Sequence, residues 1–447
     1  MKKILVPLFL VLVILLSPLS LVGCGDKNTN SKSSGGSEGK QPEQTDLSFY
    51  DSIPEKLKGT TIRFATWKDH TKEEAALVLA DFQALTGINI KLEYIPQNEY
   101  ASKLTAMVSA NQSPDMLVIN GNWLDLAGLL TPLEDAGVDT SDKFWNQDIQ
   151  NVFKINGKTY ATNAAKSAWG NHGQCVIWNK TIFNDYGIKT PQDYIDEDNW
   201  TLETFRKMLK QVSAADPDLT GGLITYNTFV QCYAKNNIVS YDPSNQTVKL
   251  DSSNDIKEAI KWCVNAQEEG IARVVYNGLG NGMNFAEGKA GIAFDSVYSI
   301  RSNGYLASMN HDDLEYALPP KADANSEYPI YGSYRAYGIC KGSKNAEATG
   351  YFIRYFTDAN SYDMSEVYPN DRALEFANNA ASKAVYKPYD ISQEVWKMVY
   401  TESQFKSFVD LTSASQVDTT FDSMISNYNP CVQKANQHLS NVVKGLK

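Results

Sequence analysis

The sequence predicts an α/β protein that folds as two lobes. Two observations lead to this fold class. Between residues 61 and 119, apolar residues alternate between strand spacing and helix spacing in regular order. The chain has 447 residues, and about 400 remain once an N-terminal leader and a polar segment are set aside, which is more than one hydrophobic core usually serves.

The first half of the chain reads strand, helix, strand, helix, strand. The strands are Thr61–Ala65, Ile88–Tyr94 and Met116–Ile119, the last a continuous apolar run typical of a strand covered on both faces. The first helix opens on a capping box at Thr71–Glu74 and ends at Gly87, and the second covers Glu99–Ala110. This order favours a parallel sheet.

The next portion is richer in helix, with short strands between the helices. One helix is capped by Thr201, and a second carries Cys263 on its apolar face, where we expect a core thiol. The remaining elements are a helix over Asn345–Asp358 and strands at Leu223–Tyr226, Gly291–Phe294 and Ala336–Cys340.

The N-terminus has the pattern of a secreted lipoprotein. Lys2 and Lys3 precede the apolar run Ile4–Leu16, whose helix would reach roughly 20 Å, short of a bilayer core of about 30 Å. Leu21–Cys24 resembles the bacterial lipobox, which implies a signal peptide at 1–23 and a lipid on Cys24. A soluble secreted protein with a chance cysteine is the alternative.

Residues 24–46 form a polar segment that cannot bury enough apolar surface to order itself, and it is expected to tether the folded part to the membrane. The protein would then lie outside the cell and meet the membrane only through its lipid.

Composition limits the partners. Loss of residues 1–23 takes Lys2 and Lys3 from the 41 basic residues, leaving 39 against 52 acids and a net charge of −13. Such a chain is a poor partner for nucleic acid. The five cysteines after Cys24 and the four histidines match no zinc or other metal pattern, so we expect no cofactor.

Several catalytic signals are weak. Gly278–Gly282 lacks the strand and helix of a nucleotide loop, and no Gly-x-Ser-x-Gly elbow occurs. The acidic runs Asp196–Asp198 and Asp312–Asp313 are expected to be solvated loops. A glycosidase needs two carboxylates at a set separation, which a sequence does not reveal, so a carbohydrate-active enzyme remains an alternative.

The chain as a whole resembles the extracellular solute-binding proteins of ABC importers, in the branch that takes oligosaccharides. Each matching patch is weak alone, but they follow in the family's order. They are Phe82–Lys91, Tyr100–Ala106 with Ser113–Asp115, Asn156–Tyr160, Trp178–Phe183, Trp200–Phe205, Phe285–Ala293 and Lys341–Ala348.

This resemblance implies a periplasmic-binding-protein-like fold. Each lobe would hold a mainly parallel sheet flanked by helices, with a ligand cleft between the lobes. We expect lobe one at 47–163 and 330–378, and lobe two at 164–329 and 379–447. The implied function is capture of a carbohydrate and delivery to a membrane permease, by a monomer and without catalysis. The same fold with a non-sugar solute is a further alternative.

Candidate ligand contacts follow from the rule that ligands sit beyond the carboxyl ends of strands. Trp67 and Asp69 follow the first strand, and Asn120, Asn122 and Trp123 follow the third. Aromatic rings cover the C–H faces of sugars, and polar side chains pair with their hydroxyls.

Further candidates stand at the lobe junctions and after the strands of lobe two. Each could equally be interlobe packing. They are Lys166, Trp169, Tyr226, Phe229, Asp295, Tyr298, Tyr331, Ser333, Tyr334 and Arg335. Lys68 and Arg301 are expected to be solvated.

Overall fold

The computed structural model describes residues 48–68, 70, 74–97, 99–119, 126–167, 173–234, 239–242, 245, 247–250, 254–275, 285–332, 335–384, 411 and 413–445. These residues belong to one compact unit, Glu43–Lys447. None of the helices within them has the length and apolarity needed to cross a membrane. The predicted lipobox and the predicted tether lie outside the described residues. Of the predicted capping box at Thr71–Glu74, only Glu74 is described.

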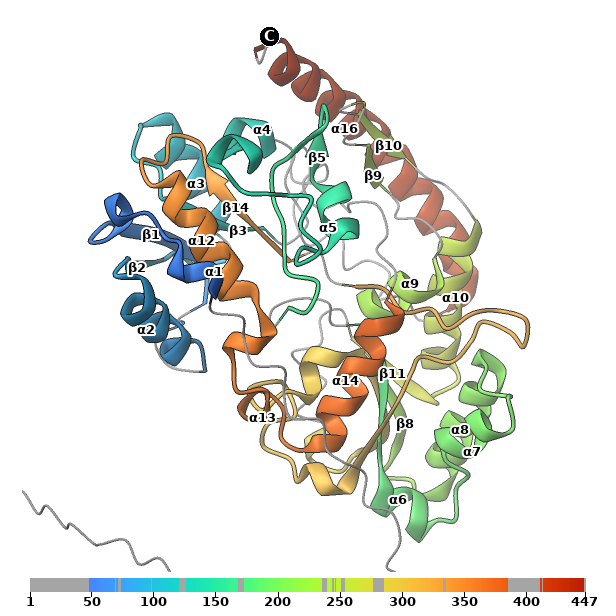
Figure 1. Ribbon diagram of the computed structural model, residues 1–447. Coiled ribbons are helices and arrows are strands. Elements are labelled where there is room, and N and C mark those ends of the chain that lie inside the picture. Colours follow the sequence, from blue (N-terminus) through green and yellow to red (C-terminus); the bar gives the residue numbers. More distant parts are fainter. Residues whose placement is uncertain are drawn as a thin grey trace, which may run out of the picture. The chain divides into compact units, whose positions relative to one another are not determined.

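The first sheet has the strand order β2-β1-β3-β14-β4 (Figure 1). Strand β1 pairs in parallel with β2 and with β3, which confirms the predicted order of the first half. Strand β14 runs antiparallel to β3 and β4. The strands are β1 Thr61–Thr66, β2 Asn89–Tyr94, β3 Met116–Ile119, β4 Leu130–Thr131 and β14 Ala336–Cys340.

Helices cover both faces of this sheet because successive strand residues point to opposite sides. Phe64 and Val118 pack under α1, α2 and α12, whereas Ala65 and Leu117 pack under α3, α4 and α5. These helices are α1 Ser48–Asp51, α2 Glu74–Thr86, α3 Tyr100–Ser109, α4 Leu126–Leu129, α5 Gln147–Val152 and α12 Ala346–Thr357.

The second sheet has the strand order β11-β8-β12-β7-β13. Strands β11, β8 and β12 are parallel to one another, and β7 is antiparallel to β12 and to β13. The strands are β7 Gln174–Asn179, β8 Thr220–Thr225, β11 Ala272–Val275, β12 Ala290–Ser296 and β13 Leu314–Ala317. The predicted strand Leu223–Tyr226 runs one residue past the end of β8, because Tyr226 begins helix α9.

Helices also cover both faces of the second sheet. Phe294 faces α8, α9 and α10, and Cys263 of α10 is buried there as expected. Ile177 faces the opposite cluster, which contains α14. Thr201 caps α8 as predicted. The helices are α6 Lys180–Asp185, α7 Pro191–Asp196, α8 Leu202–Ala215, α9 Tyr226–Tyr233, α10 Asn254–Glu268, α13 Met364–Val367 and α14 Asp371–Lys383.

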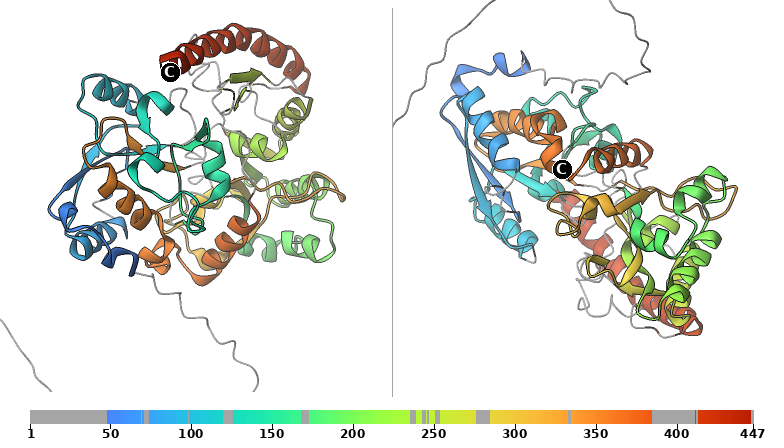
Figure 2. Two further views of the ribbon diagram at one scale, coloured as in Figure 1. Left: turned by 45° about the horizontal axis from the view of Figure 1, so that its top comes forward. Right: turned by 90° about the horizontal axis from the view of Figure 1, so that it is seen from below.

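Two hairpins and a long C-terminal helix complete the fold. Strands β5 Lys154–Ile155 and β6 Lys158–Thr159 are joined by Asn156 and Gly157, both with positive φ, as the Asn-Gly pair predicts. Strands β9 Val239–Asp242 and β10 Thr247–Leu250 lie beside α16 Val417–Gly445 (Figure 2). The side chain of Asn436 in α16 bonds both backbone groups of Val248, at 2.6 and 3.0 Å.

The packing suggests a shift in one lobe boundary. Helices α13 and α14 belong to the hydrophobic cluster of the second sheet, although residues up to 378 are expected in lobe one. We therefore propose that the second segment of lobe one ends near Asp363. Helix α16 contributes Phe421 to the cluster of the second sheet and Tyr428 to a cluster that includes residues of the first.

Candidate functional site

The carboxyl end of β1 places Trp67 at one edge of the first sheet. Its ring is half-buried and stands edge-on to Tyr100, with ring centres 4.8 Å apart and planes at 89°. The amide of Lys68 donates to the Thr66 hydroxyl at 3.1 Å, which fixes the turn that follows the strand. Asp69, Asn120, Asn122 and Trp123, predicted at the same edge, lie outside the described residues and stay predictions.

The corresponding edge of the second sheet carries Asp295, which is 4% exposed. Its carboxylate accepts hydrogen bonds from the Ser296 amide at 2.8 Å and the Ser299 hydroxyl at 3.0 Å. Burial raises the pKa of the Asp295 carboxyl, and these bonds, with one from Thr225 at the end of β8, lower it only in part. The carboxyl group is therefore held by its own lobe.

The aromatic candidates that follow β8 and β12 are buried to different depths. Tyr298 is half-buried and meets Tyr305 edge-to-face at 5.5 Å, so part of its ring is open to solvent. Tyr226 is buried at the start of α9. Phe229 is 0% exposed and packs on Trp262 at 4.5 Å, inside the cluster of the second sheet. Because its ring has no open surface, we leave Phe229 out of the site proposed below.

Two chain segments pass between the sheets, one leading from β6 to β7 and the other from β13 to β14. These two passages bond to each other near each sheet. On the side of the first sheet, Asn163 donates to the Arg335 carbonyl at 2.9 Å, and Thr162 and Tyr337 exchange backbone bonds of 3.0 and 2.8 Å. On the side of the second sheet, the Gln174 side chain donates to the Tyr331 carbonyl at 2.9 Å and accepts from its amide at 2.8 Å.

The other junction candidates have mixed positions. Lys166 is exposed, and its carbonyl accepts from the Ala359 amide at 2.9 Å, which ties the segment between α12 and α13 to the passage between β6 and β7. Tyr331 and Arg335 are half-buried. Trp169, Ser333 and Tyr334 lie outside the described residues, so their roles stay predictions.

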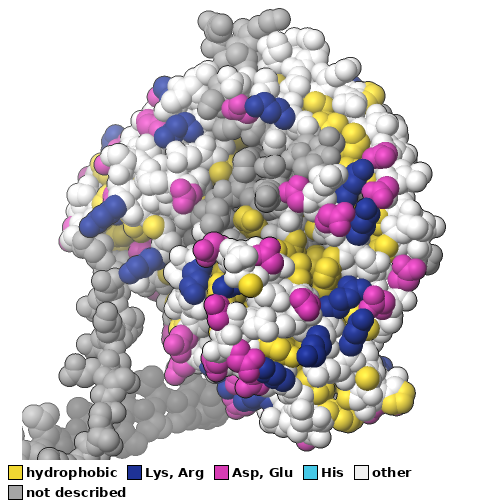
Figure 3. Space-filling view, turned by 90° about the vertical axis from the view of Figure 1, so that its right-hand side faces the viewer, with side chains coloured by type: hydrophobic (Ala, Val, Ile, Leu, Met, Phe, Trp, Pro, Cys, Tyr) yellow, Lys and Arg dark blue, Asp and Glu magenta, His cyan; other side chains and the backbone are white. Residues whose placement is uncertain are grey.

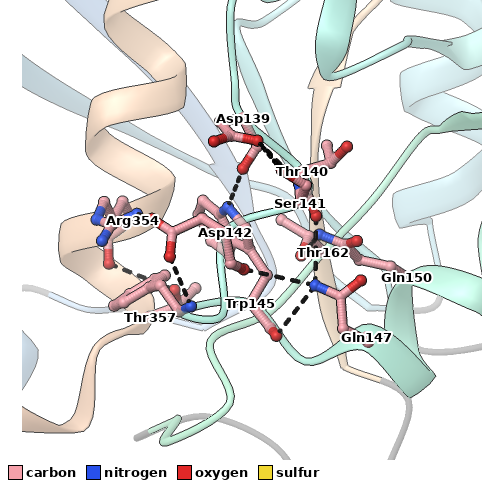
Figure 4. A network of polar contacts seen from close by, with 11 residues as sticks. Asp139, Thr140, Ser141, Asp142, Trp145, Gln147, Gln150, Thr162, Arg354 and Thr357 are labelled. Atoms are coloured by element: carbon pink, nitrogen blue, oxygen red, sulfur yellow. Dashed lines mark hydrogen bonds and ion pairs between the residues drawn. The ribbon is translucent and has the colours of Figure 1, made fainter.

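A polar network in the first lobe includes Thr162, which belongs to the passage from β6 to β7. Arg354 of α12 forms an ion pair of 2.6 Å with Asp142, and Gln150 of α5 donates to the Thr162 hydroxyl at 3.2 Å (Figure 4). The Arg354 guanidinium also lies between two aromatic rings, 4.2 Å from the centre of Phe49 and 4.0 Å from that of Phe144. The start of the folded region is thereby fastened to the same lobe as this passage.

Arg301 corrects a sequence expectation. It was expected in solvent, but it is 0% exposed, with its guanidinium 5.8 Å from the ring centre of Tyr368. The sequence misleads here because the short helix η4 (Val297–Ile300) turns the chain after β12, and Arg301 then packs on Tyr368, which is distant in sequence. Such a turn leaves no periodic signal in the sequence.

Two further residues at the passages were missed. Neither Gln174 nor Asn163 is among the candidates named from the sequence. Asn163 stands at the predicted end of the first segment of lobe one, which was the available signal, whereas no sequence signal marks Gln174. Only the structure shows that both bond the other passage.

The arrangement suits reversible binding of a polar molecule. Both edges combine half-open aromatic rings with groups that donate or accept hydrogen bonds. No group of His, Cys, Asp or Glu that could hold a metal ion occurs among the described residues. Charges of both signs are interspersed over the described part of the face in Figure 3.

The sequence of the chain is similar to sequences of known proteins. The sequence model of the family described as bacterial extracellular solute-binding protein matches residues 78–369. The erythritol/L-threitol-binding protein of Mycolicibacterium smegmatis is 21% identical over 231 residues, 46% of this chain and 47% of that relative. The aligned stretch therefore spans about half the length of that protein.

Solved structures share the fold. An ABC substrate-binding protein from Listeria monocytogenes in complex with cycloalternan has a TM-score of 0.61 at 17% identity, covering 83% of this chain and 98% of that one. UgpB from Mycobacterium tuberculosis in complex with glycerophosphocholine has a TM-score of 0.59 at 17% identity, covering 85% and 98%. At these identities the likeness establishes a two-lobed fold.

Proposed function

This chain belongs to the bacterial extracellular solute-binding protein family, and we propose that it captures a carbohydrate, an oligosaccharide in our reading, for an ABC importer. It would bind at the edges that carry Trp67 and Tyr298, without catalysis, and deliver the ligand to a membrane permease. It would act as a monomer on the outer face of the cell membrane, held by a lipid on Cys24.

One topological observation carries the proposal. Strand β7 begins at Gln174 opposite the end of β12, and β14 begins at Ala336 opposite the end of β3. Each of these antiparallel strands starts where the chain arrives from the other sheet. Both carboxyl edges therefore border the same pair of bonded passages, which is where a ligand could touch both lobes at once.

The chemistry at these edges supports a sugar. A ring such as Trp67 or Tyr298 can cover the C–H face of a sugar, and amides, hydroxyls and carboxylates can pair with its hydroxyls. The cycloalternan complex of one structural neighbour and the tetritol named for the sequence relative are both rich in hydroxyls. The glycerophosphocholine complex of another neighbour keeps a phosphorylated solute as the alternative.

Calorimetry and thermal unfolding against a panel test this proposal. The panel holds oligosaccharides of several linkages, erythritol, glycerophosphocholine and amino acids. We expect a micromolar or tighter dissociation constant for an oligosaccharide, about −8 kcal/mol or stronger. At a free ligand concentration 100 times the dissociation constant, binding should raise the free energy of unfolding by about 2.7 kcal/mol.

The panel also separates the alternatives. A response to glycerophosphocholine, erythritol or an amino acid with no response to any oligosaccharide would retain the binding fold and overturn the sugar assignment. Products released from an oligosaccharide, detected by chromatography of the same mixtures, would favour a carbohydrate-active enzyme.

A further inference from the structure

Tyr100 places its hydroxyl group between two strands of the first sheet. The hydroxyl donates to the carbonyl of Ala65 in β1 at 2.6 Å and accepts from the amide of Val118 in β3 at 3.1 Å. The side chain comes from the first residue of α3 and is 2% exposed. A helix side chain thus takes part in the hydrogen bonding between neighbouring strands.

The hydroxyl lies where the pairing of these strands ends. The last paired residues are Ala65 and Leu117, although β1 continues to Thr66 and β3 to Ile119. In a parallel pair the amide after Leu117 would point at the Ala65 carbonyl, and these are the two groups that the hydroxyl bridges. The oxygen atom therefore acts as a spacer at the carboxyl edge.

The ring of Tyr100 also supports the candidate aromatic of this edge. Trp67 stands edge-on to it, with ring centres 4.8 Å apart and planes at 89°. This is a favourable geometry for an aromatic pair. One side chain therefore controls both the spacing of the strand ends and the orientation of the indole.

We propose that Tyr100 is a positioning residue: it holds the carboxyl ends of β1 and β3 apart and sets the Trp67 ring for ligand. It is not expected to touch the ligand, since it is buried beneath the edge. The role in binding rests on the proposed function, whereas the control of Trp67 does not.

The Tyr100→Phe variant removes one oxygen atom and leaves the ring. The Val118 amide and the Ala65 carbonyl must then pair directly or lose a partner at this point, and an unpaired buried group is unfavourable. We expect the strand ends to close together and the Trp67 ring to shift.

Fluorine NMR of protein labelled with 5-fluorotryptophan measures this shift without ligand. Trp67→Phe identifies the Trp67 resonance. Tyr100→Phe should move that resonance and leave the signals of the second lobe in place. The matched control is Tyr233→Phe, which removes a hydroxyl that donates to the Pro320 carbonyl at 2.8 Å in the second lobe. It should leave the Trp67 resonance unchanged.

Ligand affinity gives the second readout. Tyr100→Phe should weaken binding of the best oligosaccharide about fivefold or more, whereas Tyr233→Phe should not. An unmoved Trp67 resonance in Tyr100→Phe overturns the inference whether or not a ligand is known. If the wild-type protein binds no panel member, the proposed function fails and the fluorine spectrum still decides the role of Tyr100.

A measurement on the wild-type protein covers the case in which Tyr100→Phe does not fold. The Tyr100 hydroxyl proton, or the ring protons beside it, should show nuclear Overhauser effects to the Val118 amide and to the Trp67 ring. Absence of both contacts in well-resolved spectra would overturn the inference.

Discussion

Asp295 is a buried acid at the end of β12, three positions before the half-buried Tyr298. Its raised pKa means that the folded protein binds a proton more tightly there than the unfolded chain does. The contribution of this group to stability is therefore complete below the unfolded pKa of about 4 and is lost as the pH rises through the folded pKa.

The variant Asp295→Asn has no charge to bury at any pH. Its stability relative to the wild-type protein should therefore improve as the pH rises above the unfolded pKa of about 4 and through the raised folded pKa, because the wild-type carboxyl then loses its proton. Urea unfolding of both proteins at several pH values measures this difference. A constant difference, or one that favours the wild-type protein at higher pH, would show that burial does not control this carboxyl.

Trp123 is the aromatic residue that the sequence places beyond β3. Replacing it with Ala should weaken oligosaccharide binding by about 1 kcal/mol or more, roughly fivefold, because a stacking ring is lost. Tyr94→Ala, at an exposed ring on edge strand β2, is the control and should bind as the wild type does. Unchanged calorimetric affinity in Trp123→Ala would place that ring in the core or at the rim.

At the scale of elements, the two passages are the distinctive feature. Two side-chain amides join the passages: Asn163 bonds Arg335 beside the first sheet, and Gln174 bonds Tyr331 beside the second. These bonds join residues 172 and 157 positions apart, so they form only once distant parts of the chain have come together. They tie the two passages to each other where each one reaches its sheet.

Gln174→Ala removes two hydrogen bonds to the backbone of Tyr331. We expect it to lower the free energy of unfolding by about 1–3 kcal/mol, because partly buried backbone groups lose their partners. Chemical denaturation measures the loss. Gln437→Ala, at an exposed amide on α16, should change stability by only a few tenths of a kcal/mol. Equal effects of the two substitutions would contradict a clamp at Gln174.

At the scale of the whole molecule, the start of the described chain packs on the first lobe alone. Phe49 and Tyr50 of α1 pack on α12, with Phe49 against Arg354 and Tyr50 against Tyr355 at 5.3 Å. The start of the described chain therefore packs on the first lobe. If Cys24 carries the proposed lipid, the first lobe would be the part that follows the anchor along the chain.

Cys24→Ala tests the anchor in cells. We expect the protein to move from the membrane fraction to the soluble extracellular fraction, because one lipid-bearing thiol is the proposed attachment. Cys431→Ala alters a buried thiol of the folded region and should stay with the membrane. Membrane retention of Cys24→Ala after a high-salt wash would refute lipid attachment at this residue.

The elements were largely predictable, and the site was not. Helices such as α8 and α10 and the strands β1 and β3 show periods that depend on neighbouring residues alone. Trp67 and Asp295 could be named as candidates because ligands bind where strands end, and their role in binding stays a prediction. The sequence left Phe229 open between ligand contact and packing, and it wrongly placed Arg301 in solvent. Both side chains are buried by residues from other parts of the chain, which a local pattern does not reveal.

The sequence by itself determined the α/β class, the order of the elements in the first sheet and the family to which the chain belongs, because these follow from local periods and ordered patches. Tertiary structure alone decided that Gln174 clamps Tyr331, that Arg301 is buried and that the Tyr100 hydroxyl spaces two strands. Each of these contacts joins residues that are distant in sequence or turned by an irregular loop. No local pattern encodes such a contact, since its geometry exists only after both partners have packed.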